Sequence, residues 1–238
     1  MRRVHLLLYG LDEVPADLPA LAALLRRGRA IPDPAAQRAA SPGERLARLF
    51  APTPGGCASL ARARMVLDGL AAGEDDWLCA DPVHLRLMRD HLLLADSHVF
   101  ELGADEATAL VAGLNRHFAE RIVFVQGAPE RWYARVPAGD GVPPQPPLDA
   151  CLARPLPAPQ AGAPGAVLLT EIQMFLHAHA VNAAREARAA DPVNSVWLWG
   201  GGDAGRPRAP APCIVCDGPL CSALATAAGV TPAPPEAF

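Results

Sequence analysis

The sequence predicts a mixed α/β (α+β) protein, and three observations point to that class. The chain has 238 residues, of which 51% are hydrophobic and 19% charged, as is typical of a globular protein with a sizeable core. Short apolar runs of strand type alternate with segments of helical spacing along most of the chain. Proline-rich segments separate these elements, above all over 137–165, where neither a helix nor a central strand is expected.

Residues 1–76 predict one buried strand followed by helices. The apolar run 4–8 is closed by a Tyr-Gly pair, which is typical of a strand at the start of an α/β unit. Residues 18–25 suit a short helix. Apolar residues at helical spacing predict two further helices, over 44–50 and 59–70.

Residues 77–202 predict a second unit, built around a sheet. Trp77–Ala80 has strand composition, and Asp81-Pro82 is expected to end that strand. The elements that follow are a strand, a helix, a hairpin of two strands, a long helix and a strand. This order is typical of the split βαβ, or ferredoxin-like, fold. The expected ranges are 92–95, 105–118, 122–125, 132–136, 167–190 and 195–199.

Residues 203–238 predict a small C-terminal part. An apolar pair at 214–215 precedes a short helix over 219–228, which Gly229 ends. We expect this part to join residues 1–76 in a separate, reduced α/β layer. The unit at 77–202, with its proline-rich loop at 137–165, is then inserted into that layer or packed on it.

The composition excludes several classes of function. All 21 basic residues are arginines, so no lysine can form a Schiff base, anchor pyridoxal phosphate or complete a Walker A loop. The net charge of −4 is spread along the chain without a basic stripe, which argues against a nucleic-acid partner. The N-terminal apolar run is too short for a signal peptide or a membrane span, so we expect a cytoplasmic protein with no membrane partner.

The six cysteines are expected to be free thiols in a reducing compartment. Three of them form the pattern Cys213-x2-Cys216-x4-Cys221, which resembles half of a zinc site. A structural zinc site needs four ligands, and a redox Cys-x-x-Cys motif is expected at the start of a helix. Incidental thiols are therefore the favoured interpretation, and a zinc or redox module stays the alternative.

A glycine-rich segment follows the last predicted strand of the 77–202 unit. Residues 200–205 match the G-x-G-x-x-G pattern of dinucleotide-binding folds, but a proline-rich stretch follows where that fold needs a helix. A turn that lets the backbone approach a neighbouring segment or a ligand is the favoured interpretation. An anion site with Arg206 or Arg208 nearby is the alternative.

Acidic residues and histidines gather in the stretch that contains Asp81, His84, Asp90 and His91. Carboxylates and imidazoles bind zinc and manganese, but this spacing matches no compact metal motif. No Gly-x-Ser-x-Gly elbow marks a nucleophilic serine. The residues alone therefore do not define a catalytic constellation.

Two neighbouring segments carry a family resemblance. The run His179-Ala-Val-Asn182-Ala-Ala-Arg185, followed by Asn194 and Gly200-Gly-Gly202, resembles the archaeal-type cofactor-independent phosphoglycerate mutases. In overall form the chain is similar to a short proteobacterial relative of those mutases, the regulation-of-pathogenicity-factor type E regulatory protein family. The resemblance implies a ferredoxin-like inserted domain on a reduced alkaline-phosphatase-like layer. The candidate ligand-binding residues that it implies are Asn182, Arg185, Asn194, Gly200, Gly201 and Gly202.

The chain departs from the mutase pattern where the chemistry lies. The mutases use two divalent metals and a phosphoryl-accepting serine, and this sequence has no serine in the expected context. The resemblance therefore favours a non-catalytic regulatory or small-anion-binding protein without a cofactor. Its partner would be a small phosphorylated or anionic metabolite, another protein or a second copy of the chain. The alternative is a metal-dependent mutase-like or phosphatase-like enzyme, with manganese or zinc ligands drawn from Asp12, Asp81, His84, Asp90 and His91.

Some of these residues have a second interpretation in the fold itself. Asn182 and Asn194 can bridge a helix–strand junction, Arg185 can pair within the chain, and the glycines can turn the backbone. The aromatic residues Trp132, Tyr133, Trp197 and Trp199 suit either an interface or the core.

Overall fold

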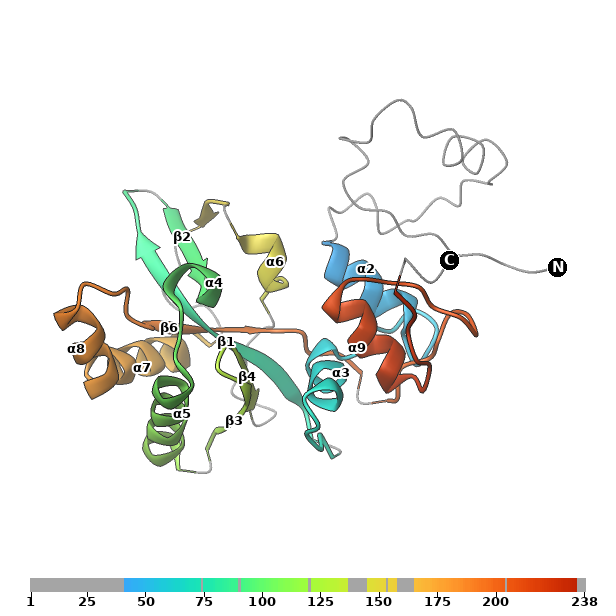
Figure 1. Ribbon diagram of the computed structural model, residues 1–238, viewed down its shortest axis with the longest axis horizontal. Helices are drawn as coiled ribbons and strands as arrows, with labels where there is room; N and C mark the ends of the chain where they lie inside the picture. The colour runs from blue at the N-terminus through green and yellow to red at the C-terminus, as the bar shows by residue number, and fades with distance from the viewer. Residues whose placement is uncertain are drawn as a thin grey trace.

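The computed structural model describes residues 41–234 except 74, 90, 120, 137–144, 153, 158–164 and 204. The strand predicted at 4–8, the helix predicted at 18–25 and most of the proline-rich loop lie outside the described residues. The described elements form two groups that lie side by side, a sheet with its helices and a smaller group of helices (Figure 1). No helix among these residues is long and apolar enough to cross a bilayer.

The sheet has six strands, which are β1 (Trp77–Leu87), β2 (His91–Asp96), β3 (Val123–Ala128), β4 (Arg131–Arg135), β5 (Leu156–Pro157) and β6 (Ser195–Trp199). Every pairing between them is antiparallel. The order is β3-β4-β1-β2-β5, and β6 pairs with β1 as well. Cys79 pairs with β4 and β6, and Val83 pairs with β2 and β6, so β4 and β2 share one side of β1.

The prediction that Asp81-Pro82 ends the first strand is wrong, because β1 continues to Leu87. The backbone N–H and C=O of Leu85 both bond to the Asn194 side chain, on the β6 side of β1. Backbone groups alternate along a strand, so the nitrogen of Pro82 faces the opposite side. On that side β4 pairs only as far as Cys79 and β2 begins at Val83, so the proline removes no bond of the ladder.

The first strand of the predicted strand–helix–strand–strand–helix–strand order also needs correction. The range 92–95 falls in β2, which forms a hairpin with β1 and, among the described strands, pairs otherwise with β5 alone. The strand that pairs with both β4 and β6 is β1. Local apolar composition suits either strand, and only the long-range pairing shows which one is central.

Four helices belong to the sheet group, namely α4 (Ser97–Phe100), α5 (Ala104–Phe118), α7 (Ala166–His177) and α8 (Ala180–Ala187). The helix predicted at 105–118 is confirmed by α5. The single helix predicted at 167–190 is wrong, because the chain breaks at His179, whose backbone is extended. There the Nδ1 atom of His179 accepts a hydrogen bond from the N–H of Val181 at 3.2 Å and caps α8.

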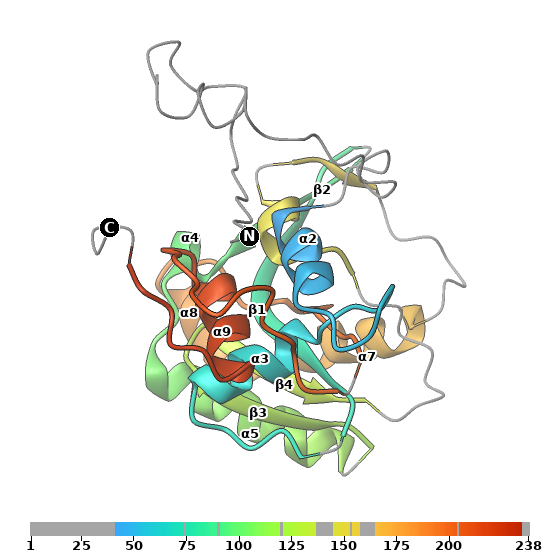
Figure 2. The same ribbon diagram turned by 90° about the vertical axis from the view of Figure 1, so that its right-hand side faces the viewer.

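Helices α2 (Pro42–Leu49), α3 (Leu60–Leu67) and α9 (Pro219–Ala227) form the second group, which we call the helical group; the short helix α6 (Leu148–Cys151) lies nearby. Serines cap α2 and α3, through the side chains of Ser41 and Ser59. Helix α3 packs against both α9 and β1 (Figure 2). These helices agree with the expected ranges 44–50, 59–70 and 219–228 within a few residues.

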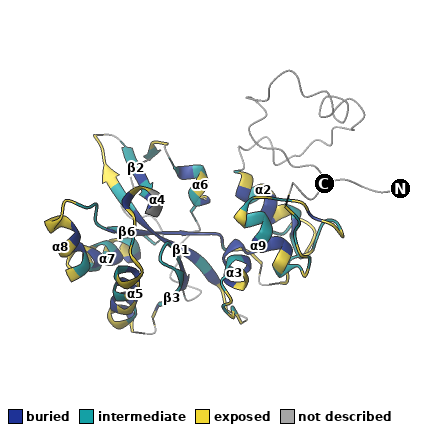
Figure 3. Cartoon of the chain, viewed as in Figure 1, coloured by how far each residue is buried: buried dark blue, intermediate teal, exposed yellow. Residues whose placement is uncertain are grey.

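Strands β1 and β6 are covered on both faces where they pair with each other. All five residues of β6 are buried (Figure 3). On one face Cys79 and Trp199 share an apolar core with the helical group. On the other face Ala80 and Leu198 share a core with α5 and α7. Successive side chains of β1 and β6 point to opposite faces of the sheet, so these two strands contribute to both cores. The two groups are thus joined through one sheet.

Candidate functional site

Asn182 and Asn194 tie together the ends of α7, α8 and β6. The amide nitrogen of Asn182 donates to the carbonyls of Leu176 and Val193 at 2.7 and 2.8 Å, and its oxygen accepts from the N–H of Val193 at 2.9 Å. Asn194 exchanges two hydrogen bonds with the backbone of Leu85, at 2.7 and 2.8 Å, and so extends the β1–β6 pairing. Each amide therefore uses both its donor and its acceptor within the chain.

Arg185 is 1% exposed and bonds only to groups of the chain in its described contacts. Its Nε donates to the carbonyl of Asp191 at 2.8 Å, and Nη1 forms an ion pair with Glu106 at 2.6 Å. Further bonds go to the carbonyls of Phe100 and Glu101. The buried guanidinium thus holds the start of α5 against the end of α8. A buried charge is tolerated when it is paired and hydrogen-bonded, and here each of the three guanidinium nitrogens has a partner.

The three glycines at the end of β6 let the chain pass close to α3. Gly200 has a φ of +73° and its carbonyl accepts from the N–H of Ala61 at 2.9 Å. A β-carbon at Gly202 would lie 2.6 Å from the carbonyl oxygen of Cys57. At Gly201 it would lie 2.8 Å from the side chain of Leu78. The positive φ at Gly200 and the close approach of neighbouring atoms at Gly201 and Gly202 account for this glycine run.

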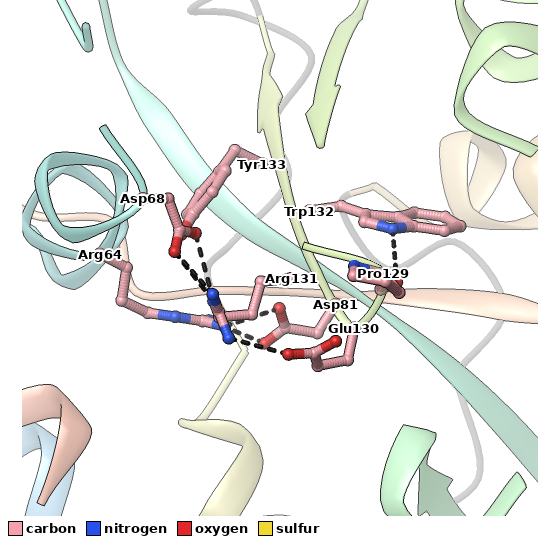
Figure 4. Close-up of polar contacts among 8 residues, drawn as sticks. All are labelled: Arg64, Asp68, Asp81, Pro129, Glu130, Arg131, Trp132 and Tyr133. Carbon is pink, nitrogen blue, oxygen red and sulfur yellow. Dashed lines mark hydrogen bonds and ion pairs between the residues drawn. The ribbon is translucent and has the colours of Figure 1, made fainter. Parts of the chain in front are cut away.

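Asp81 lies in a buried polar cluster between α3 and the sheet (Figure 4). Arg64, from α3, binds both carboxylate oxygens of Asp81, at 2.9 and 3.1 Å. The indole N–H of Trp199 donates to the same carboxylate at 2.8 Å. The guanidinium of Arg64 also lies over the rings of Trp199 and Tyr133, at 5.3 and 5.8 Å from their centres.

A second carboxylate, that of Asp68, lies at the end of α3 in the same cluster. It accepts from Arg131 at 2.7 Å and from the hydroxyl of Tyr133 at 2.6 Å (Figure 4). Burial alone would raise the pKa of Asp68, but the hydrogen bonds from Arg131 and Tyr133 lower it. Burial raises the pKa of Tyr133 and raises that of Cys79 to about 12, so both stay neutral at pH 7.

We call these six residues the α3–sheet network: Arg64, Asp68, Asp81, Arg131, Tyr133 and Trp199. Asp81 is a metal candidate from the sequence, whereas the roles of Arg64 and Asp68 are not predicted from it. The available signal was a pair of opposite charges four residues apart on the helix predicted at 59–70. That spacing predicts a pair within the helix, whereas here each residue reaches across to a different strand.

The structure does not bring the described metal candidates together. Asp81 and His84 are three residues apart on β1 and lie on opposite faces. The Nδ1 atom of His84 lies 2.8 Å from the carbonyl of Pro192. His84 pairs with Ala95, four residues along β2 from His91, which is roughly 13 Å along the strand. Within the described residues no three metal-binding side chains form a group, while Asp12 and Asp90 lie outside them. The metal set as a whole stays a prediction.

The aromatic residues proposed for either an interface or the core are all buried. Trp132 and Tyr133 are 0% exposed, and Trp197 and Trp199 are 8% and 3% exposed. Trp132 and Tyr133 point to opposite faces of β4 (Figure 4). The core interpretation is therefore confirmed for these four side chains.

Comparisons with known proteins give only distant matches. No family model matches the chain. No curated protein matches it either. Among solved structures it is similar to the PH0037 protein from Pyrococcus horikoshii, with 16% identity and a TM-score of 0.41 over 83% of this chain and 48% of the other. It is also similar to a cofactor-independent phosphoglycerate mutase from Thermoplasma acidophilum, with 14% identity and a TM-score of 0.38 over 81% of this chain and 56% of the other.

The chain spans about half the length of these two solved structures. At these identities and TM-scores the two matches establish no residue-by-residue correspondence.

Proposed function

We propose that this protein is a non-catalytic regulatory protein, related to the cofactor-independent phosphoglycerate mutases, that acts by binding a partner and not by turnover. One observation carries the proposal. The described polar side chains that carry the family resemblance, Asn182, Arg185 and Asn194, direct their hydrogen bonds to the chain itself. They secure helix and strand ends, which is a structural task.

The same contacts bear on what kind of ligand the protein binds. Arg185 is buried and paired with Glu106, so it would have to break an ion pair before it could bind a small anion. The more exposed Arg86 and Arg121 pair with Asp191 and Glu171. These pairs favour a protein partner over a phosphorylated metabolite, and the metabolite remains the ligand class to be tested directly.

The strand order supports the fold part of the proposal. Across the sheet, β6, β1, β4 and β3 are neighbours, all antiparallel, with α5 between β1 and β3 in sequence and α7 and α8 between β4 and β6. This order is that of a ferredoxin-like split βαβ unit, with β2 as an added hairpin strand. We propose that residues 77–202 form this unit. We further propose that 1–76 and 203–238 derive from an alkaline-phosphatase-like layer.

The proposal is tested on tag-free, full-length protein purified without added metal. Mass spectrometry measures its manganese and zinc content, and coupled assays measure phosphoglycerate mutase and phosphatase activity. Calorimetric titration with 3-phosphoglycerate and with inorganic phosphate measures anion binding. We expect no turnover, with or without added manganese.

Turnover would overturn the proposal if His84→Ala abolished it while the protein stayed folded by circular dichroism. His84 suits this test because its removal leaves the α3–sheet network intact, whereas Asp81→Ala would leave Arg64 unpaired. The matched control is His117→Ala, since His117 lies on the surface beside Glu171 and is not among the metal candidates. Activity lost in both variants would point to unfolding, and activity lost only with His84 would point to metal chemistry.

A further inference from the structure

The strand order of the sheet ends at β5 on one side and at β3 on the other, and these two edges differ in kind. Strand β5 has two residues, one of them a proline, so it offers few backbone groups to another strand. Strand β3 has six residues and contains neither a charge nor a proline. Among the described strands it pairs with β4 alone. An edge of this composition is the kind that pairs with a strand of another chain.

An asparagine of α5 lies against this edge, since α5 packs beside β3 (Figure 1). The side-chain oxygen of Asn115 accepts from the N–H of Phe124 at 2.7 Å, and its amide nitrogen donates to the carbonyl of Phe124 at 2.8 Å. Two turns earlier on the same helix, the hydroxyl of Thr108 donates to the side-chain oxygen of Gln126 at 3.1 Å. Asn115 therefore bonds to Phe124 as a residue of a neighbouring strand would.

These two bonds lie on the side of β3 that faces away from β4. The backbone N–H and C=O of one strand residue point to the same side, and successive residues alternate between the two sides. Val123 and Val125 therefore turn their backbone groups toward β4, while Phe124 and Gln126 turn theirs outward. After Gln126 the register with β4 shifts by one residue, which interrupts the regular edge.

The sheet contains a second asparagine of this type. Asn194 exchanges two hydrogen bonds with the backbone of Leu85, at 2.7 and 2.8 Å. The last pair between β1 and β6 is that of Val83 with Ser195, so Leu85 lies just beyond the end of β6. In both places a side-chain amide bonds to a strand residue where no strand pairs with it among the described residues.

We propose that Asn115 closes the outer edge of β3 and prevents two copies of the chain from pairing through this edge. With the backbone groups of Phe124 occupied, Gln126 is the one outward residue left in the regular part of β3. The bonds of a single residue do not offset the entropy that two chains lose on association. Without Asn115 the edge presents two successive outward residues, and two such edges can pair antiparallel about a two-fold axis.

The experiment compares the full chain with its Asn115→Leu variant by sedimentation velocity over a wide range of protein concentrations. Leucine is close to asparagine in size and favours a helix, but it offers Phe124 neither a donor nor an acceptor. We expect the average mass of the variant to rise with concentration to at least twice that of the original protein. Circular dichroism measures whether the variant is folded.

The matched control adds Gln126→Pro to the Asn115→Leu variant. Because the N–H of Gln126 faces away from β4, a proline there removes no bond between β3 and β4, but it removes a donor from the edge. We expect this double variant to keep the mass of the original protein. Association of both variants would mean that a surface other than the β3 edge holds the copies together, and it would overturn the proposal.

Amide hydrogen exchange in the original protein gives a second test, which does not require any variant to fold. We expect the N–H of Phe124 to exchange about tenfold more slowly than that of Gln126, because Asn115 accepts a hydrogen bond from the first alone. Equal rates would overturn the proposal, and so would a folded Asn115→Leu variant that keeps the original mass at every concentration. Neither measurement involves turnover or partner binding, so a failure here leaves the proposed regulatory function untouched.

Discussion

The sheet group and the helical group place their polar side chains in different ways. In the sheet group Asn182 and Arg185 are each 1% exposed, and both donate hydrogen bonds to backbone carbonyls of the chain. In the helical group the side chains of Ser41 and Ser59 cap helix ends, and the sulfur of Cys216 lies 3.6 Å from the hydroxyl of Ser222. Residues that match the family motif can thus be the ones whose hydrogen bonds stabilise the fold.

The α3–sheet network joins the two groups, so its removal should have the largest effect. Arg64→Met leaves the carboxylate of Asp81, which is 3% exposed, without its cation. We expect a loss of about 3–5 kcal/mol in the free energy of unfolding, because a buried charge without a partner is costly. Urea unfolding followed by tryptophan fluorescence measures it, since Trp199 lies in the network.

The matched control for Arg64 is Arg86→Met. Arg86 also binds an aspartate, Asp191, but its side chain is 61% exposed. A surface ion pair contributes about 0–1 kcal/mol, so this variant should unfold nearly as the original does. Equal losses in the two variants would show that the network does not hold the groups together.

Within the sheet group, Asn182→Leu should have the next largest effect. The substitution keeps the size of the side chain but leaves the N–H and C=O of Val193 without the Asn182 amide, while the C=O of Leu176 keeps its bond from the N–H of His179. We expect a loss of about 2–3 kcal/mol, the cost of leaving buried backbone groups unsatisfied. Gln126→Leu removes an exposed amide bonded to Thr108 and serves as the control in the same urea titration.

The Asn182→Leu variant also distinguishes a structural role of this residue from a ligand-binding role. If Asn182→Leu unfolded like the original protein but weakened calorimetric binding of an anion, a ligand role would replace the structural one. In that case the sheet group would contain a ligand-binding side chain, contrary to the structural role given to it above.

The predictions from sequence succeeded where the signal is local and failed where it is not. Helical spacing is enough to find α5, and an apolar run of high strand propensity is enough to find β6. The continuation of β1 through Pro82 is possible because no strand pairs with Pro82 on the side that its nitrogen faces, between the end of β4 and the start of β2. That arrangement exists only in the folded sheet. The break at His179 depends on a side-chain cap that competes with a continuous helix.

The contacts of the candidate site residues could not be predicted for a related reason. Arg185 meets Glu106 across 79 positions, and Trp199 meets Asp81 across 118. No spacing rule connects residues so far apart. Sequence patterns identified residues that matter, and only the fold shows that they bind to each other.

The junction between the groups can be tested sterically at Gly202. In Gly202→Ala the new methyl group would lie 2.6 Å from the carbonyl oxygen of Cys57, and backbone would have to move. We expect a loss of about 1–3 kcal/mol, as for other overpacked sites. Gly218→Ala, where the methyl group meets open space, should cost less than about 1 kcal/mol in the same thermal melt. If Gly202→Ala did not change the stability, the turn after β6 would not pack as closely against the Cys57 backbone as the structure shows.

The smallest effect concerns the pH dependence of the sheet group, through His179. Burial, aided by Arg116, lowers the pKa of His179 in the folded protein below its usual value near 6.5. The unfolded chain therefore binds the proton more readily, and the stabilising contribution is complete above about pH 6.5 and declines as the pH falls through the folded pKa. Protonation of Nδ1 also removes the acceptor that caps α8.

His179→Asn keeps a capping side chain but cannot titrate in this range, so it isolates the effect. Between pH 7.5 and 5.5 we expect the original protein to lose up to about 1 kcal/mol more than the variant does, as measured by urea unfolding at each pH. The histidines at the surface are present in both proteins and cancel in this difference. Parallel curves for the two proteins would mean that the end of α7 and the start of α8 do not depend on this cap, and that Asn182 alone fixes the junction.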